Sequence, residues 1–225
     1  MTYSVKELYF TLQGEGANAG RPAVLLRFAG CNLWTGREQD RARAVCRFCD
    51  TDFFGTDGTG GGKFRTAGEL ASSVRETWPR DLTPIPPLHS VERGDVEMRP
   101  FVVCTGGEPL LQLDAPLIDA LHRDGFEIAV ESNGTIPALP GIDWLCVSPK
   151  ADASLVQQSG DELKLVYPQE RGAPERYAAL DFRHFFLQPM DGPDLSRNTA
   201  LAERYCLEHP QWRLSLQMHK LVGLR

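Results

Sequence analysis

Three cysteines stand close together near the start of the chain, Cys31, Cys46 and Cys49, with the spacing C-x14-C-x2-C. Thiolates bind soft metal centres such as zinc and iron–sulfur clusters. A closed structural zinc site needs a fourth ligand, and the histidine nearest to the triplet is His89. Three thiolates on a cluster of four irons leave one iron open, where a small molecule can bind and be reduced. Structural zinc, a chance grouping and a catalytic cluster are the three interpretations, and we favour the cluster.

Other polar groups follow predicted strands. Gly106 and Gly107 come directly after an apolar run, and two glycines let the backbone approach a ligand closely. Glu108 comes next, and its carboxylate is able to accept hydrogen bonds from an ammonium group. A ligand at this edge of a sheet would also meet the polar residues that follow later strands, namely Ser132, Asn133, Ser148, Lys150 and Gln188.

Apolar runs that alternate with helical patterns predict the elements that position these residues. Strands alternating with helices indicate βαβ units and a parallel sheet. About six strands are too few for a complete eight-stranded barrel, so we expect an α/β fold, a partial (β/α)6-type open barrel. Ligands bind at the carboxyl ends of such strands. The predicted strands are 22–28, 101–105, 127–132, 144–148, 162–167, 184–188 and a final one at 212–220, and the predicted helices are 66–78, 113–125 and 194–209.

Composition limits the class of protein. The chain has 225 residues, 42% hydrophobic and 24% charged, which suits a single domain spanning 1–225. The net charge of −6 argues against a nucleic-acid partner held by a basic surface. No apolar run reaches the ~18 residues of a membrane span and no signal peptide is evident, so we expect a cytoplasmic protein without a membrane partner. Without an export signal we expect no disulfide framework, and Cys104, Cys146 and Cys206 are interpreted as buried apolar side chains.

Two segments do not fit the pattern of strands and helices. The glycine-rich stretch 55–64 is predicted to be a loop, and it is not a phosphate-binding loop because Phe64 follows Lys63 where that motif needs Ser or Thr. The stretch 79–100 is rich in proline and charge, and we expect an irregular insertion there.

Taken together, the motifs resemble those of the radical S-adenosylmethionine superfamily, in which three clustered cysteines follow the first strand and GGEP follows the next. The common cysteine spacing there is C-x3-C-x2-C, and the longer spacing here implies an insertion in the cluster-binding loop, 31–49. That departure resembles the 7-carboxy-7-deazaguanine synthases. The further motifs that match this family are YFTLQGEG (9–16), RFAGCNLWT (27–35), CDTDF (49–53), TGGEP (105–109), ESNGT (131–135), SPK (148–150) and QMHK (217–220).

The resemblance implies a radical lyase that converts 6-carboxy-5,6,7,8-tetrahydropterin to 7-carboxy-7-deazaguanine with loss of ammonia, on the route to queuosine and related 7-deazapurines. A [4Fe–4S] cluster on Cys31, Cys46 and Cys49 would cleave S-adenosylmethionine, and no catalytic group beyond the resulting radical is expected. The S-adenosylmethionine site would comprise Gly106, Gly107, Glu108, Ser132, Asn133, Ser148, Lys150 and Gln188.

The resemblance also assigns a substrate site. Glu15 would accept from the amide and amino group of the pterin edge, beside Gln13. Arg27 would bind the substrate carboxylate, and Gln217 and His219 are further candidates. Oxygen ligands suit Mg²⁺, which the resemblance places on Thr51 with Asp50 nearby.

The resemblance implies a homodimer, and the arginines of the insertion suit an acidic, flavodoxin-type reductant. A glycyl-radical activase on the same scaffold is one alternative function. A non-catalytic zinc-stabilised binding module is the other, but it leaves TGGEP unexplained. The arginines concerned are Arg37, Arg41, Arg43 and Arg47.

Overall fold

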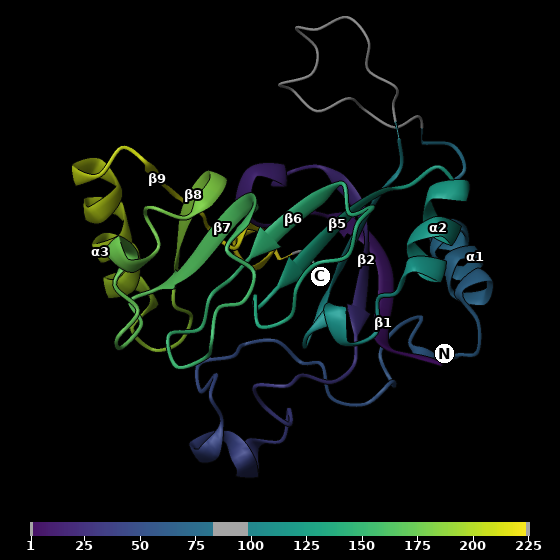
Figure 1. The fold of residues 1–225 in the computed structure, drawn as a ribbon, viewed down its shortest axis with the longest axis horizontal. Helices are drawn as coiled ribbons and strands as arrows, with labels where there is room; N and C mark the ends of the chain where they lie inside the picture. Colours follow the sequence, from purple (N-terminus) through teal and green to yellow (C-terminus); the bar gives the residue numbers. More distant parts are fainter. Residues whose placement is uncertain (1, 83–98, 224–225) are drawn as a thin grey trace, which may run out of the picture.

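A nine-stranded sheet forms the body of the molecule in the computed structural model, which describes residues 2–82 and 99–223 (Figure 1). The strand order is β3-β1-β2-β4-β5-β6-β7-β8-β9. Most of the predicted irregular insertion at 79–100 lies outside the described residues. The strands are β1 (Tyr3–Leu12), β2 (Pro22–Phe28), β3 (Gly62–Phe64), β4 (Phe101–Gly106), β5 (Glu127–Ser132), β6 (Trp144–Val147), β7 (Ser159–Tyr167), β8 (Asp181–Pro189) and β9 (Trp212–Leu214).

β2 and the strands β4 to β9 pair in parallel, which confirms the predicted parallel α/β arrangement. β1 and β3 are antiparallel additions at one edge. None of the helices in the described part of the chain is long and apolar enough to cross a membrane. The helices are α1 (Ala67–Thr77), α2 (Ala115–Arg123), α3 (Leu195–Glu208) and the short α4 (Met218–Leu221).

Local signals fix two of the predicted helices. Thr66 caps α1 by accepting a hydrogen bond from the backbone of Glu69, and Asp114 caps α2 by accepting one from Leu117. Gly125 follows α2 with a φ of 83°, a left-handed conformation in which glycine is favoured.

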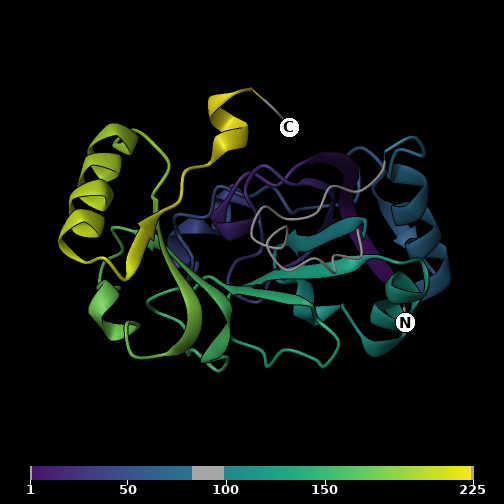
Figure 2. The ribbon, with the colours of Figure 1, turned by 90° about the horizontal axis from the view of Figure 1, so that it is seen from above.

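The two faces of the sheet differ in chemistry. On β7, Leu163 and Leu165 point into the main apolar core, whereas Glu162 and Lys164 point to the opposite face. The helices α1, α2 and α3 cover the core face, with α1 and α2 at one end and α3 at the other (Figures 1 and 2). The other face is therefore left to build a site.

The sequence did not predict β1, which supplies one wall of that site. Its register shifts between Val5 and Glu7, and this irregularity interrupts the alternation that normally marks a strand. The glycine-rich segment packs on it, and a Cβ on Gly61 would lie 2.2 Å from the Lys6 carbonyl oxygen. That close backbone contact explains the glycines, and the last residues of the segment form β3, a difference from the loop expected throughout 55–64.

The final predicted strand, 212–220, is wrong beyond Leu214. Ser215 still donates its backbone N–H to Leu187, but the chain then leaves β8 and Met218 donates to the carbonyl of Gly14. Residues from Met218 onward form α4 rather than continuing as a strand.

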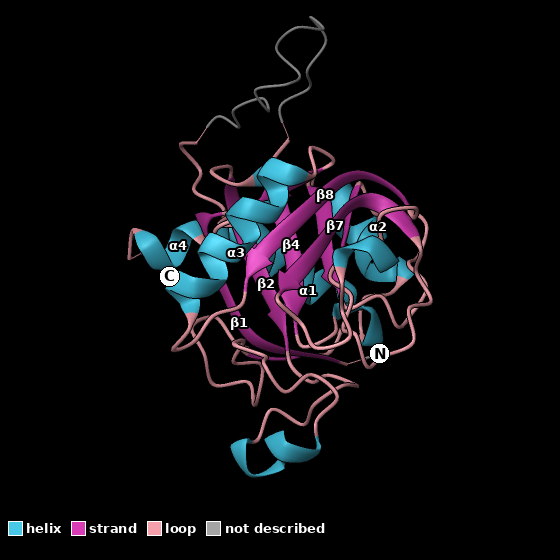
Figure 3. Ribbon diagram, turned by 90° about the vertical axis from the view of Figure 1, so that its left-hand side faces the viewer, coloured by secondary structure: helices cyan, strands magenta, loops and turns pink. Residues whose placement is uncertain are grey.

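The segment between the first two cysteines of the triplet includes a 3-10 helix, η2 (Glu38–Arg43), which projects away from the sheet in Figure 3. Arg41 holds this segment in place. Its guanidinium lies 4.1 Å from the ring centroid of Trp34 and donates to the carbonyl oxygens of Arg47 and Cys49.

Candidate active site

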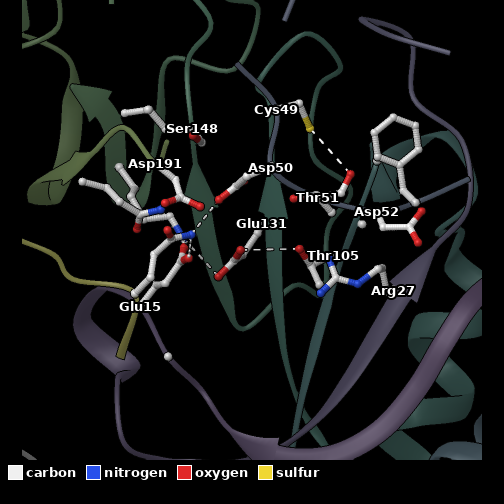
Figure 4. A pocket seen from close by; sticks show the side chains of 18 of the residues that line it. Glu15, Arg27, Cys49, Asp50, Thr51, Asp52, Thr105, Glu131, Ser148 and Asp191 are labelled. Carbon is white, nitrogen blue, oxygen red and sulfur yellow. Dashed lines mark hydrogen bonds and ion pairs between the residues drawn. The ribbon is translucent and has the colours of Figure 1, made fainter. Parts of the chain in front are cut away.

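A cavity of about 410 Å³ opens at the carboxyl ends of the parallel strands (Figure 4). Its walls come from β1, β2, β4, β5, β7 and β8, from the cysteine segment and from the residues around α4. This is the edge at which parallel α/β sheets bind ligands. All the residues predicted to bind metal, cofactor or substrate line this cavity except Glu108.

The three cysteines of the triplet lie together at one end of the cavity. Cys46 donates a hydrogen bond to Cys49, which raises the pKa of the Cys46 thiol and lowers that of Cys49 to about 6. Burial raises the pKa of Cys31, whose sulfur accepts the backbone N–H of Leu33 at 3.4 Å. All six cysteines are free thiols. Cys104 and Cys146 are buried as predicted, whereas Cys206 is only partly buried, so the prediction is wrong for that residue.

This donor set fits a cluster better than a single ion. Within residues 2–82 and 99–223, no three side chains of His, Cys, Asp or Glu are grouped so as to share one metal ion. In an iron–sulfur cluster each thiolate binds a different iron, so the sulfurs do not have to converge on one point. Three thiols that line one cavity, without a fourth ligand beside them, match that requirement.

Gly106 and Gly107 pack against the chain that leads into Cys31. A Cβ on Gly106, whose φ is 122°, would lie 2.2 Å from the Phe28 carbonyl oxygen, and one on Gly107 would lie 2.0 Å from that of Gly30. Glu108 donates its backbone N–H to the same Gly30 oxygen at 3.0 Å. The glycines are therefore required to bring the two strand ends together beside the thiols.

Glu108 has a different place from the one expected. Its side chain is fully buried and does not line the cavity. The carboxylate accepts hydrogen bonds from Leu110 N at 3.0 Å, Ser132 Oγ at 2.9 Å and Asn133 N at 2.7 Å. Burial raises its pKa, while these donors favour the ionised form. Glu108 thus ties the end of β4 to the end of β5, and a direct contact with S-adenosylmethionine stays a prediction.

The remaining predicted cofactor residues line the cavity wall. Lys150 donates to both the carbonyl and the hydroxyl of Ser148, at 2.9 and 2.6 Å. Gln188 accepts from the Ser215 hydroxyl at 3.4 Å. Asn133 places its amide 4.0 Å from the Cys31 sulfur, so this part of the wall adjoins the cysteines.

The predicted substrate residues Gln13, Glu15 and Gln217 line the end of the cavity beside α4. Glu15 accepts from the Gln217 amide at 2.9 Å, and the same amide nitrogen donates to Asp50 at 3.0 Å. Gln13 donates to Glu131 at 2.9 Å. A chain of amides and carboxylates from distant parts of the sequence therefore forms this end, with α4 brought against it by the bond from Met218 to Gly14.

Arg27 and His219 reach the cavity with partners of their own. Arg27 pairs with Glu7 at 2.6 Å, and although burial disfavours its charge, Tyr9 and Glu7 raise the pKa of its guanidinium. The ring of His219 packs on Gly14, where a Cβ would lie 2.2 Å from Nδ1. Both side chains are positioned, and their contacts with a substrate stay predictions.

Oxygen groups surround the segment after Cys49. Thr51 lines the cavity, and Asp52 lies 3.0 Å from the Lys6 ammonium. Asp50 accepts from Lys220 at 2.7 Å. Burial acts to raise the pKa of Asp50, but hydrogen bonds from Lys220 and Gln217 outweigh it and lower that pKa. Lys220 and Gln217 already bind the Asp50 carboxylate, and a cation on Thr51 stays a prediction.

Glu131 and Lys164 are among the charged residues of the cavity that were not predicted as site residues from the sequence. Glu131 lies between Glu15 on one side and Thr105 and Arg27 on the other in Figure 4. Lys164 contacts both Glu15 and Glu131, at 2.5 and 3.3 Å. The sequence signal for them was the alternation of charged and apolar residues within β5 and β7. Since alternate residues of a strand point to opposite faces, a charged residue inside such an apolar strand indicates that one face of the sheet lines a polar site.

Comparison with known proteins gives a consistent result along the whole chain, although no family model matches it. The chain is 63% identical over its full length to a 7-carboxy-7-deazaguanine synthase of Caulobacter vibrioides, and 59% identical to one of Burkholderia multivorans. In both cases the match extends over the full length of the relative's sequence. A crystal structure of QueE from Escherichia coli superposes with a TM-score of 0.64 at 27% identity, covering 97% of this chain and 95% of the other.

Proposed function

The chain belongs to the 7-carboxy-7-deazaguanine synthase family, and we propose that it is a lyase converting 6-carboxy-5,6,7,8-tetrahydropterin to 7-carboxy-7-deazaguanine with loss of ammonia. It thereby serves the biosynthesis of queuosine and related 7-deazapurines. One observation in the structure carries the proposal. A thiol triplet and a set of amide and carboxylate groups face one cavity, so that a redox centre and a nitrogen heterocycle fit side by side.

The family implies a radical enzyme with a [4Fe–4S] cluster and S-adenosylmethionine. Cys31, Cys46 and Cys49 would hold the cluster, since their sulfurs line one end of the cavity. When bound, the cluster and S-adenosylmethionine supply a carbon radical that removes a hydrogen atom from the substrate. Packing of Gly106 and Gly107 against the chain before Cys31 supports a cofactor site at this point.

The wall residues next to the thiols have the chemistry to hold a zwitterionic nucleoside. Backbone groups of Gly106 and Gly107 are suited to an amino end, and the Lys150 ammonium to a carboxylate. Ser132, Asn133, Ser148 and Gln188 would bond the remaining polar groups. Glu108 acts indirectly here, because its carboxylate fixes Ser132 and Asn133. We propose that the fold that carries these residues is an open, partial barrel with an enlarged cluster loop.

The opposite end of the cavity would bind the pterin. The carboxylates of Glu15 and Glu131 accept hydrogen bonds, as the ring N–H and amino group of a pterin require. Gln13 and Gln217 are bound to these carboxylates and set their direction. Arg27 would neutralise the substrate carboxylate, with His219 closing the site. We further propose that Thr51, with Asp50 nearby, would hold a Mg²⁺ ion, which would help to neutralise the substrate carboxylate, since Mg²⁺ prefers oxygen ligands.

An acidic flavodoxin-type reductant would dock on the segment between Cys31 and Cys46. Arg37, Arg43 and Arg47 are exposed there, next to the thiols, while Arg41 is turned inward onto Trp34. Such a charge arrangement speeds encounter with an acidic partner. A homodimer, which the family resemblance implies, and a cytoplasmic location belong to the same proposal.

The test is a product analysis. Protein reconstituted anaerobically with iron and sulfide receives reductant, S-adenosylmethionine, Mg²⁺ and 6-carboxytetrahydropterin, with a Cys46→Ala variant as control. We expect 5′-deoxyadenosine and 7-carboxy-7-deazaguanine from the wild type and neither from the variant. Deoxyadenosine without the deazapurine would refute the substrate and retain the radical chemistry. Neither product from cluster-loaded wild-type protein would refute the proposal as a whole.

A further inference from the structure

Lys164 is a buried ammonium group in the middle of the cavity wall. Its side chain is 4% exposed, and it extends from β7 on the face opposite the apolar core. Charged lysines are rarely buried unless they are paired, so its surroundings have to explain it. Burial disfavours the charge, but the nearby carboxylates raise the pKa of Lys164 well above its usual value.

Three carboxylates surround this single cation. Lys164 lies 2.5 Å from Glu15 and 3.3 Å from Glu131, which come from the segment after β1 and from β5. Glu162 lies two residues away on the same face of β7. We refer to Glu15, Glu131, Glu162 and Lys164 as the Lys164 cluster. Without the ammonium, the two carboxylates that it bridges would repel each other in a poorly hydrated site.

Glu162 secures the chain that carries Glu15. Its carboxylate accepts the backbone N–H of Ala17 at 2.8 Å. A Cβ on Gly16, whose φ is 67°, would lie 2.0 Å from the same carboxylate, so this residue must be glycine for the segment to pack there. Burial raises the pKa of Glu162. Two residues on the same face of β7 thus hold the segment 15–17. Glu162 binds its backbone, and Lys164 binds the Glu15 side chain.

The outward groups of the cluster are acceptors in fixed positions. Glu15 is bonded through one oxygen to Lys164 and through the other to Gln217, and Glu131 is bonded to both Lys164 and Gln13. Neither carboxylate is free to rotate without breaking an ion pair. Such a pair of ionised acceptors suits a ligand edge that carries two N–H donors and rejects an edge that presents a carbonyl oxygen instead.

We propose that Lys164 is a positioning residue that sets substrate specificity, by holding Glu15 and Glu131 as paired ionised acceptors for the donor edge of the pterin. This inference rests on the proposed function. It concerns selection at the amino group of the ring and not the cleavage of S-adenosylmethionine.

Binding of two stable aromatic analogues tests it. The probes are 6-carboxypterin and 6-carboxylumazine, in which a carbonyl oxygen replaces the 2-amino group. Their dissociation constants are measured by equilibrium titration of the cluster-loaded protein in the presence of S-adenosylmethionine. For the wild type we expect a preference for the pterin of about 100-fold or more, because a site built to bind a donor leaves its acceptors unpaired with the analogue.

Lys164→Met is expected to weaken binding of 6-carboxypterin by about 100-fold and to reduce the preference for it over 6-carboxylumazine below about threefold. The reason is that loss of the buried ammonium leaves the Glu15 and Glu131 carboxylates without their ion pair. Lys164→Arg keeps the charge and is expected to keep most of the preference. Formation of 5′-deoxyadenosine in the absence of substrate is measured for each variant as a separate readout of cofactor cleavage, so that an effect on substrate preference is distinguished from a general loss of activity. Lys63→Met, an exposed lysine of β3, is the control for loss of a lysine.

If Lys164→Met kept the wild-type preference for 6-carboxypterin over 6-carboxylumazine, the inference would be overturned. If that variant does not load the cluster, Lys164→Arg decides: retained preference supports the role, and lost preference with normal cofactor cleavage overturns it. A wild-type protein that binds neither analogue and makes no deazapurine would instead refute the proposed function, which is a separate result.

Discussion

Replacing Glu108 with glutamine is expected to destabilise the protein and to loosen the cofactor wall. One carboxylate oxygen accepts from Leu110 N and Ser132 Oγ, and the other accepts from Asn133 N at 2.7 Å. An amide has one acceptor oxygen, so in Glu108→Gln the NH₂ group must face one of these donors. The change removes a hydrogen bond to a charged group, worth about 1.5–3 kcal/mol, and leaves a buried donor without an acceptor.

We therefore expect a loss of about 3 kcal/mol in the free energy of unfolding, which corresponds to a fall in Tm of about 6–12 °C for a protein of this size. The assay is thermal unfolding of the metal-free protein followed by circular dichroism, with Glu203→Gln, an exposed residue of α3, as the matched control. The affinity of the cluster-loaded variant for S-adenosylmethionine should also fall, because Ser132 and Asn133 lose their anchor. A Tm within about 1 °C of the wild type would refute the reasoning.

Three further predictions concern the cysteine segment and α4. Gly107→Ala places a Cβ 2.0 Å from the Gly30 oxygen, so the iron content after reconstitution should fall to less than half, and normal loading would contradict the packing described. Lys220→Met should lower Tm by a constant amount above about pH 5, and the difference from the wild type should shrink below about pH 4. The sign follows from the lowered pKa of Asp50, whose contribution is complete above its ordinary value of 3.8 and is lost as pH falls through the lowered value. A difference that grows in acid would contradict it. Reversing the exposed charges with Arg37→Glu, Arg43→Glu and Arg47→Glu should slow flavodoxin-driven turnover about tenfold and spare dithionite-driven turnover. Equal rates with both reductants would argue against docking at this segment.

The parallel strands were predictable because each is an apolar run that ends in glycine or polar residues. β1 was not, since its bulge between Val5 and Glu7 interrupts the alternation and its polar residues face the cavity. β3 exists only through pairing with β1, which a glycine-rich sequence does not reveal. α4 depends on the bond from Met218 to Gly14, a contact between the two ends of the chain that local sequence cannot encode.

The site was predictable where a residue follows a strand, because the carboxyl ends of parallel strands meet at one edge. Glu108 shows the limit of that rule. The conformation of Gly106, with a φ of 122°, belongs to the turn that sends Glu108 into the protein interior, and the sequence gives no direction for the side chain. Glu131 and Lys164 lie within strands, so a rule about strand ends did not find them.

The central claim is that three cysteines leave one iron of a cluster open for S-adenosylmethionine inside this cavity. The most direct measurement is the electron paramagnetic resonance spectrum of the reduced, reconstituted protein before and after addition of S-adenosylmethionine. With about four irons per chain by metal analysis, we expect a cluster signal that changes when S-adenosylmethionine is added, since binding would occur at an iron. A cluster signal that S-adenosylmethionine leaves unchanged, or a purified protein holding one zinc and no iron, would contradict it.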